Sequence, residues 1–228
     1  MSEDRVVLVP GASGGLGPAV VDTLLSRGFS VAAVARRPPT HKSDRFLGIA
    51  ADLTKPSDAD RAVKETIARF KKLECIVHVM GGYSGGDPLH QTSDEILDRM
   101  IDLNLRGLFN TLRATIPHIM EAKTRGRIIG IGSRVAVEPG GWMAAYSASK
   151  AAVVALIKST SQEIRESGAT ANVLLPSMID TTANRESDPG ADYSQWVKPE
   201  SIARTIAWLL SDESHDINGA TIPIYGRS

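Results

Sequence analysis

Residues 6–17 read VVLVPGASGGLG, and the helical run of residues 19–25 follows almost directly. A buried strand, a glycine-rich turn and a helix N-terminus, in this order, present backbone N–H groups and the positive end of a helix dipole to a phosphate. Glycine suits the turn because a Cβ would hold the phosphate away from the backbone. An ordinary glycine-rich turn is the alternative, but the position straight after the first strand favours a dinucleotide site.

Six further apolar runs follow the first, and stretches with helical periodicity separate them. The expected strands are residues 5–9, 30–35, 46–50, 75–80, 127–131, 171–175 and 220–224. Continuous rather than alternating apolar runs are typical of strands covered on both faces. The sequence therefore predicts an α/β protein with a Rossmann-type, doubly wound parallel sheet of about seven strands and helices on both faces. We expect one domain over residues 1–228.

Composition limits the function classes. The 228 residues include 26 Lys and Arg against 26 Asp and Glu, so the formal charge is zero and favours neither nucleic acid nor an acidic membrane as a partner. The only cysteine, Cys75, excludes an internal disulfide and a cysteine metal cluster, and no metal site is expected. Neither a signal-peptide core nor an apolar stretch of about 18 residues appears. We expect a cytoplasmic protein that acts on a small molecule.

One irregular stretch, residues 181–198, is rich in Asp, Asn, Ser and Pro. This composition indicates a surface loop, with room for a short helix, after the sixth expected strand. Loops beyond the carboxyl ends of parallel strands border the ligand crevice. Residues 181–198 are therefore the expected substrate loop.

Tyr146 and Lys150 are four residues apart in a predicted helix, so their side chains share one face. A carbonyl that receives a hydride becomes an alkoxide and needs a proton. A phenol with a pKa of about 10 is a sluggish donor at neutral pH, and a nearby cation stabilises the phenolate and lowers that pKa. The pair predicts Tyr146 as the proton donor and Lys150 as the cation that tunes it. Alone, the pair is equally typical of an amphipathic helix surface.

Two more polar residues fit the same chemistry. Ser133 directly follows the expected strand at 127–131, where its hydroxyl could orient a substrate carbonyl and stabilise developing negative charge. Asn104 lies within a helical stretch, although asparagine is not favoured inside helices. Its position calls for a reason beyond helix propensity.

These features resemble the short-chain dehydrogenase/reductase family from Val6 to about Tyr225. Gly11, Gly15 and Gly17 have the family spacing, and the catalytic candidates Asn104, Ser133, Tyr146 and Lys150 follow in the family order. The resemblance implies an NAD(P)-dependent oxidoreductase. The cofactor residues that it implies are Gly11, Ser13, Gly14, Gly15, Leu16, Gly17, Arg36, Arg37, Asp52, Leu53, Gly81, Tyr146, Lys150, Pro176, Ile179 and Thr181.

The resemblance also implies individual roles. Lys150 holds the nicotinamide ribose as well as tuning the phenol, and Asn104 organises a water that leads to the lysine. Asp52 contacts the adenine, and Thr181 touches the cofactor amide. Family members also pair helices across a two-fold axis, so we expect a homodimer or a homotetramer through the helices around 97–121 and 144–165. The alanines of the second helix could equally pack within one subunit.

The second expected strand ends in Arg36 and Arg37, where NAD-dependent enzymes carry an acidic residue that binds the ribose 2′-hydroxyl. A guanidinium pairs instead with the oxygens of a 2′-phosphate, and the Ser13 hydroxyl could assist. The sequence thus favours NADP(H) over NAD(H). The alternative is that both arginines are solvated surface charges.

Several positions depart from the family pattern. Pro10 replaces the usual threonine before the glycine loop, and residues 78–81 read HVMG instead of Asn-Asn-Ala-Gly. His78 could brace the sheet by a hydrogen bond, but a buried core role is favoured because no second metal-ligating histidine accompanies it. Locally, residues 81–86, 175–185 and 191–196 resemble dihydropteridine reductase.

The sequence supports three functions. The first is an NADPH-dependent reductase of a small carbonyl or quinonoid compound; the second is reduction of a pterin; the third is a non-catalytic nucleotide-binding sensor on the same fold. Three aromatic residues could stack on a flat substrate ring or serve only as packing residues. These substrate candidates are Tyr83, Trp142 and Trp196.

Overall fold

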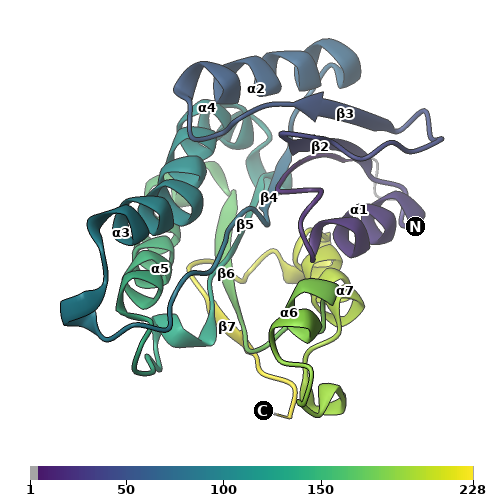
Figure 1. Cartoon of the computed structure of the whole chain (residues 1–228). Coiled ribbons are helices and arrows are strands. Elements are labelled where there is room, and N and C mark those ends of the chain that lie inside the picture. The colour runs from purple at the N-terminus through teal and green to yellow at the C-terminus, as the bar shows by residue number, and fades with distance from the viewer. Residues whose placement is uncertain (1–4, 228) are drawn as a thin grey trace.

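The computed structural model describes residues 5–227 and contains one parallel sheet in the order β3-β2-β1-β4-β5-β6-β7 (Figure 1). The strands are β1 (Val6–Pro10), β2 (Ser30–Ala35), β3 (Phe46–Ala50), β4 (Cys75–His78), β5 (Arg127–Ile131), β6 (Thr170–Pro176) and β7 (Thr221–Ile224). The predicted Rossmann-type sheet is confirmed.

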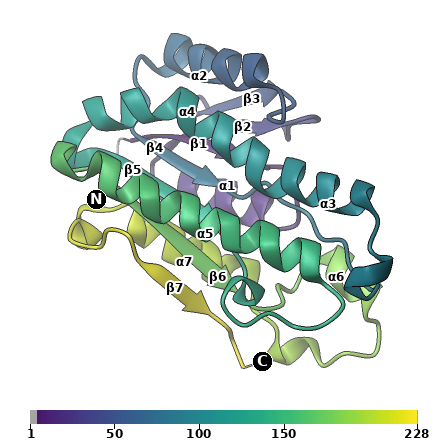
Figure 2. The ribbon, with the colours of Figure 1, turned by 90° about the vertical axis from the view of Figure 1, so that its left-hand side faces the viewer.

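Helices cover both faces of the sheet. They are α1 (Gly17–Ser26), α2 (Pro56–Phe70), α3 (Asp94–Met100), α4 (Gly107–Glu121), α5 (Ala144–Ile164), α6 (Thr182–Ser187) and α7 (Pro199–Leu209). Figure 1 shows α1 and α7 on one face and α2, α4 and α5 on the other, and Figure 2 shows α4 and α5 side by side. Three of these helices have a proline in their first turn, where the missing N–H costs no hydrogen bond.

The central strand β1 explains why the apolar runs are continuous. Val7 and Val9 pack into the cluster shared with α1 and α7, whereas Val6 and Leu8 pack into the cluster shared with α2. Both faces of this strand are therefore buried, as expected for a doubly wound sheet.

The site is positioned by the point where the strand order reverses. The chain passes outward from β1 through β2 to β3 and then returns to place β4 on the other side of β1. In open α/β sheets the ligand crevice lies outside the carboxyl ends of the strands at this switch point. Here that crevice lies between the glycine loop after β1 and the segment after β4.

The expected strand at 75–80 is too long, since β4 ends at His78. The N–H of Val79 still donates to Pro10 O at 2.9 Å, but the chain then turns away. Asn104 holds the backbone of Gly82 outside the sheet, with Gly82 N 2.9 Å from Asn104 Oδ1. The other predicted strand ends agree within one residue.

Residues 181–198 form a compact segment that contains α6 and a 3₁₀ turn at Tyr193–Gln195. A parallel bridge between Ile179 and Val197 joins its two ends. Between residues 5 and 227, none of the helices is both long enough and apolar enough to span a bilayer.

Candidate active site

Asn104 connects the segment after β4 to α5. It lies in a π-helical turn, Ile101–Arg106, that joins α3 to α4, and such turns occur often at functional sites. Its buried side chain accepts from Gly82 N at 2.9 Å and donates to Gly82 O at 3.1 Å and to Ser149 Oγ at 3.0 Å. These bonds are the reason for an asparagine within a helix, which sequence propensity alone does not explain.

Lys150 and Tyr146 come from successive turns of α5. The buried Lys150 Nζ donates to Ile131 O, the last residue of β5, at 3.1 Å, and lies 6.0 Å from the centroid of the Tyr146 ring. A Cβ added at Gly81 would lie 2.8 Å from Asn104 Oδ1 and 3.1 Å from Lys150 Nζ. A side chain at position 81 would displace one of these two groups, so Gly81, Asn104 and Lys150 converge on one point.

Burial dominates the electrostatics of the pair. Burial raises the pKa of the Tyr146 phenol, a hydrogen bond with Ser133 lowers that pKa, and the neighbouring Tyr83 phenol raises it. Burial also lowers the pKa of Lys150 to about 8. The Lys150 ammonium is bonded to Ile131 O, and its tuning of the Tyr146 phenol stays a prediction.

The pKa of Lys150 leads to a pH prediction. Because this pKa is about 8, Lys150 is cationic below that pH and loses its charge as the pH rises through it. If the ammonium binds the cofactor, the kcat/KM measured against the cofactor, which reports groups of the free enzyme, falls above pH 8. The same limb should be absent in Lys150→Arg, whose side chain keeps its charge. An identical alkaline limb in both proteins would assign the titration to another group.

One aromatic side chain borders the phenol. The rings of Tyr83 and Tyr146 meet edge to face, with centroids 5.1 Å apart and planes at 86°. Trp142, just before α5, is 65% exposed and has a φ of 67°, and its carbonyl accepts from Gly86 N at 2.7 Å. The segments before α5 and after β4 are therefore fastened together, and each carries an exposed aromatic ring.

Trp196 differs from these two residues. It is buried, and its ring packs against Tyr193 with centroids 4.8 Å apart. The expectation that Trp196 stacks on a substrate is not supported, because its ring already packs within the segment that carries it.

The glycine loop is closed by close backbone approaches. A Cβ added at Gly11, whose φ is +86°, would lie 2.4 Å from Met80 N, and one added at Gly17 would lie 2.2 Å from Ala12 O. A Cβ at Gly15 would lie 2.8 Å from Thr181 Cγ2. The loop therefore packs tightly on the segment just after β4 and on the start of α1, while Thr181 covers it from the substrate segment.

Several other proposed cofactor positions follow the carboxyl ends of β1, β2 and β3. Ser13 and Gly14 are exposed in the loop, Arg36 and Arg37 are exposed directly after β2, and Asp52 follows β3. The remaining candidates are covered: Leu16, Leu53 and Pro176 are buried, and Ile179 is half-buried.

Asp52 already makes local bonds, since its Oδ1 accepts from Thr54 N at 3.2 Å and from Thr54 Oγ1 at 2.7 Å. The side chain of Leu53 belongs to the apolar cluster beneath α2. A ligand could therefore contact Leu53 through its backbone rather than its side chain.

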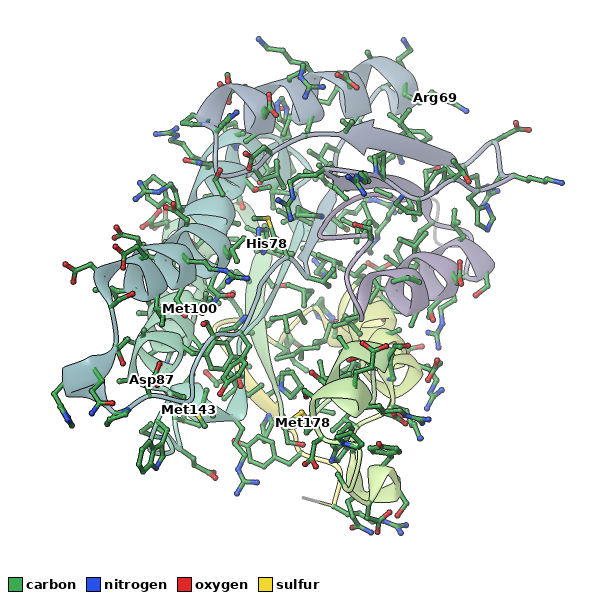
Figure 3. The ribbon with its side chains drawn as sticks, in the orientation of Figure 1. Arg69, His78, Asp87, Met100, Met143 and Met178 are labelled. Carbon is green, nitrogen blue, oxygen red and sulfur yellow. The ribbon has the colours of Figure 1, made fainter. Side chains whose placement is uncertain are left out.

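His78 lies in the interior at the end of β4 (Figure 3). Its Nε2 is buried and has no hydrogen-bond partner within residues 5–227. Burial, with the nearby charge of Lys150, lowers the pKa of His78 to about 3, so the ring is neutral at physiological pH. This environment fits the favoured core role. Among residues 5–227, no group of three or more His, Cys, Asp or Glu is placed to hold a metal ion.

Sequence reasoning missed two features of the site. The edge-to-face contact of Tyr83 with Tyr146 joins segments far apart in the chain, and no local pattern announces it. The second feature is the pairing of Asp180 with Arg185 and Lys198. The only signal in the sequence was the position of Asp180 directly before Thr181.

Comparison with known proteins agrees with this geometry. A family model described as short chain dehydrogenase matches residues 5–192. The chain belongs to this family. The match includes the glycine loop and all four catalytic candidates, so this short chain dehydrogenase is an NAD(P)-dependent oxidoreductase.

Similar proteins include carbonyl reductases. This dehydrogenase is 31% identical over 238 residues to 3-oxoacyl-(acyl-carrier-protein) reductase FabG of Escherichia coli, covering 98% of this chain and 97% of the relative. It is 28% identical over 243 residues to A-factor type gamma-butyrolactone 1′-reductase (1S-forming) of Streptomyces virginiae, covering 98% and 95%.

A crystal structure of 3-ketoacyl-(acyl-carrier-protein) reductase from Brucella melitensis complexed with NADH matches all of both chains, with a TM-score of 0.89 and 26% identity. This similarity supports a nicotinamide cofactor for this dehydrogenase. The local resemblance to dihydropteridine reductase is not shown by these matches and stays a prediction.

Proposed function

We propose that the protein is an NADPH-dependent reductase of a small carbonyl or quinonoid compound, with Tyr146 as the proton donor. The observation that carries the proposal is the convergence of Tyr146, Lys150, Asn104 and Gly81 beside the glycine loop, with Ser133 hydrogen-bonded to the phenol. When bound, a reduced nicotinamide supplies a hydride to the carbonyl carbon. Tyr146 then gives its proton to the carbonyl oxygen, and Ser133 orients that oxygen.

The loop geometry fits a dinucleotide. A Cβ at Gly11, Gly15 or Gly17 would meet Met80, Thr181 or Ala12, so glycine permits the tight turn that would aim backbone N–H groups at a pyrophosphate. By family resemblance, Lys150 would hold the nicotinamide ribose and Asp52 the adenine. The exposed Arg36 and Arg37 would pair with a 2′-phosphate, with Ser13 beside them.

The cofactor preference has a direct test in Arg36→Asp. We expect the Kd for NADPH to rise about 10- to 100-fold, because a charge-assisted contact of about 1.5–3 kcal/mol is replaced by like-charge repulsion. The Kd for NADH should change little or fall, because a carboxylate at this position can bind the ribose 2′-hydroxyl. Fluorescence titration of both cofactors measures the two constants.

Arg27→Asp is the matched control, because it makes the same charge change at an exposed site at the end of α1. It should leave the ratio of the two Kd values unchanged. An equal ratio in wild type and Arg36→Asp would show that Arg36 does not select NADPH.

Tyr83 and Trp142 are the proposed substrate contacts, because both rings are exposed, Tyr83 contacts the Tyr146 ring, and a backbone bond of Trp142 joins its segment to the one that carries Tyr83. Residues 181–198 form the proposed substrate loop. NADPH oxidation with a panel of aliphatic ketones, aryl ketones, quinones and quinonoid dihydropterin tests this choice. Turnover of the quinonoid dihydropterin alone would favour the hypothesis of a pterin reductase. Cofactor binding without turnover of any compound would favour the hypothesis of a non-catalytic nucleotide-binding sensor.

We also propose a homodimer or homotetramer through α4 and α5. On α4, Phe109 is 49% exposed and Met120 is 40% exposed, although both are apolar. On α5, Ala144, Ala148 and Ala151 are exposed and small enough for close helix contact. Light scattering coupled to size exclusion tests the assembly. The cytoplasmic location stays a sequence-based prediction.

A further inference from the structure

The two ends of the substrate loop lie side by side at the carboxyl end of β6. Ile179 and Val197 form a parallel bridge, the N–H of Asp180 donates to Val197 O at 2.8 Å, and the N–H of Val197 donates to Met178 O at 2.8 Å. The loop is therefore closed at its base by backbone bonds.

One carboxylate fastens this base to the rest of the loop. The side chain of Asp180 is only 3% exposed, and it accepts from Arg185 Nε at 2.5 Å and from Arg185 Nη2 at 2.9 Å. Lys198 Nζ donates to Asp180 Oδ2, the oxygen that also accepts from Arg185 Nη2. Hydrogen bonds from Arg185 and then Lys198 hold the pKa of Asp180 well below its usual range, so the group is an anion at neutral pH. It joins α6 to the residue that precedes α7.

The same arginine extends the network into the loop. The guanidinium carbon of Arg185 lies 4.7 Å from the ring centroid of Tyr193, which itself packs on Trp196 at 4.8 Å. The Tyr193 hydroxyl donates to Asp188 O at 3.2 Å. Asp180 thus organises, through Arg185, the side chains on both halves of the loop.

The loop also touches the cofactor side of the crevice. Thr181 caps α6, with Asn184 N 3.3 Å from its Oγ1, and its methyl group lies over Gly15. Asn184 Nδ2 donates to Ile179 O at 2.7 Å. A cavity of about 760 Å³ opens beside this segment and is lined by Asp180, Thr182, Arg185, Glu186 and Pro189.

We propose that Asp180 is a positioning residue that holds residues 181–198 closed over the crevice and sets Thr181 against the glycine loop. The inference rests on the proposed function in that the loop borders the substrate. Asp180 itself touches no reacting atom. Its loss therefore weakens retention of substrate and cofactor and has little effect on the chemical step.

The test compares Asp180→Asn with wild type by amide hydrogen exchange of the whole chain and by steady-state kinetics. The substitution keeps the shape of the side chain and removes the charge that two cations share. We expect exchange in residues 181–198 to accelerate at least about tenfold, because the charge-assisted hydrogen bonds that close the loop are weakened. KM should rise about tenfold and kcat should stay within about twofold.

Glu65→Gln is the matched control. Glu65 is an exposed carboxylate on α2, outside the substrate loop, that accepts from Arg61 Nη1 at 2.8 Å. Its substitution removes the same charge from an arginine pair and should change neither the exchange of residues 181–198 nor KM. Asp180→Glu restores the charge and should recover part of the wild-type KM, which a merely space-filling role would not predict.

Arg185→Gln serves as a second variant if Asp180→Asn does not fold, since Arg185 is half exposed and its removal leaves Asp180 bonded to Lys198. Unchanged exchange in 181–198 for the folded variants would overturn the proposal. Exchange is measured without substrate, so it decides the role of Asp180 even if no carbonyl compound is turned over. If no carbonyl compound is turned over, the proposed function fails, and the exchange data alone decide whether Asp180 positions the loop.

Discussion

Tyr146→Phe is expected to lower kcat/KM for the best carbonyl substrate by about 10²- to 10⁴-fold, the range that general acid catalysis contributes. The substitution keeps the ring and its edge-to-face contact with Tyr83 and removes only the hydroxyl that is hydrogen-bonded to Ser133. The loss should therefore appear in kcat, while the Kd for NADPH and the Tm stay close to wild type. Stopped-flow measurement of cofactor oxidation separates binding from chemistry.

Tyr193→Phe controls for the loss of a phenol in the same region. The Tyr193 hydroxyl donates to backbone oxygens inside the substrate loop, at Asp188 and Arg185, and is not placed at the proton-donor position. Its kcat should stay near that of wild type. Turnover by Tyr146→Phe within a few-fold of wild type would assign the proton to another donor.

Gly11→Ala is expected to have the largest effect on stability. Gly11 has a φ of +86°, and its added Cβ would meet the backbone of Met80 at 2.4 Å, where no flexible side chain can give way. Positive φ costs about 1–3 kcal/mol and overpacking about as much again, so we expect a loss of about 2–5 kcal/mol. For a chain of this size the Tm should fall by roughly 10 °C.

Gly141→Ala is the matched control, since a Cβ there meets no atom within 4 Å. Its Tm should change by less than about 2 °C, as is usual for an exposed substitution. Calorimetry gives both values, and NADPH titration of the folded fraction should show weaker binding for Gly11→Ala only. Equal Tm values for the two variants would mean that Gly11 is not packed on Met80, in the segment after β4, as described.

The fold could be predicted because its signals are local. Runs such as residues 30–35 are apolar on both faces, and glycine spacing, strand and helix follow within residues 6–26. The four-residue spacing of Tyr146 and Lys150 also translates directly into a shared helix face. The signal that ends β4 is not local, because Asn104, which is distant in the chain, holds the backbone of Gly82 outside the sheet.

The electrostatics of the site could not be predicted in the same way. The pKa of Tyr146 depends on how deeply the phenol is buried. The orientation of the Lys150 side chain depends on its hydrogen bond to Ile131 O, which the packing of α5 on β5 makes possible. Likewise, the burial of Trp196 follows from its contact with Tyr193, whereas its residue type alone suggested a substrate contact. Residue identity predicts which chemistry is available, and tertiary packing decides which groups take part.

Transfer of deuterium from NADPH labelled at nicotinamide C4 to a carbonyl substrate tests the central claim most directly. Mass spectrometry of the alcohol product should show one deuterium on the former carbonyl carbon, with the hydroxyl proton coming from solvent. In Tyr146→Phe the label should still reach the carbon, but far more slowly. Absence of the label from the product of an active wild-type reaction would contradict hydride transfer to a carbonyl at this site.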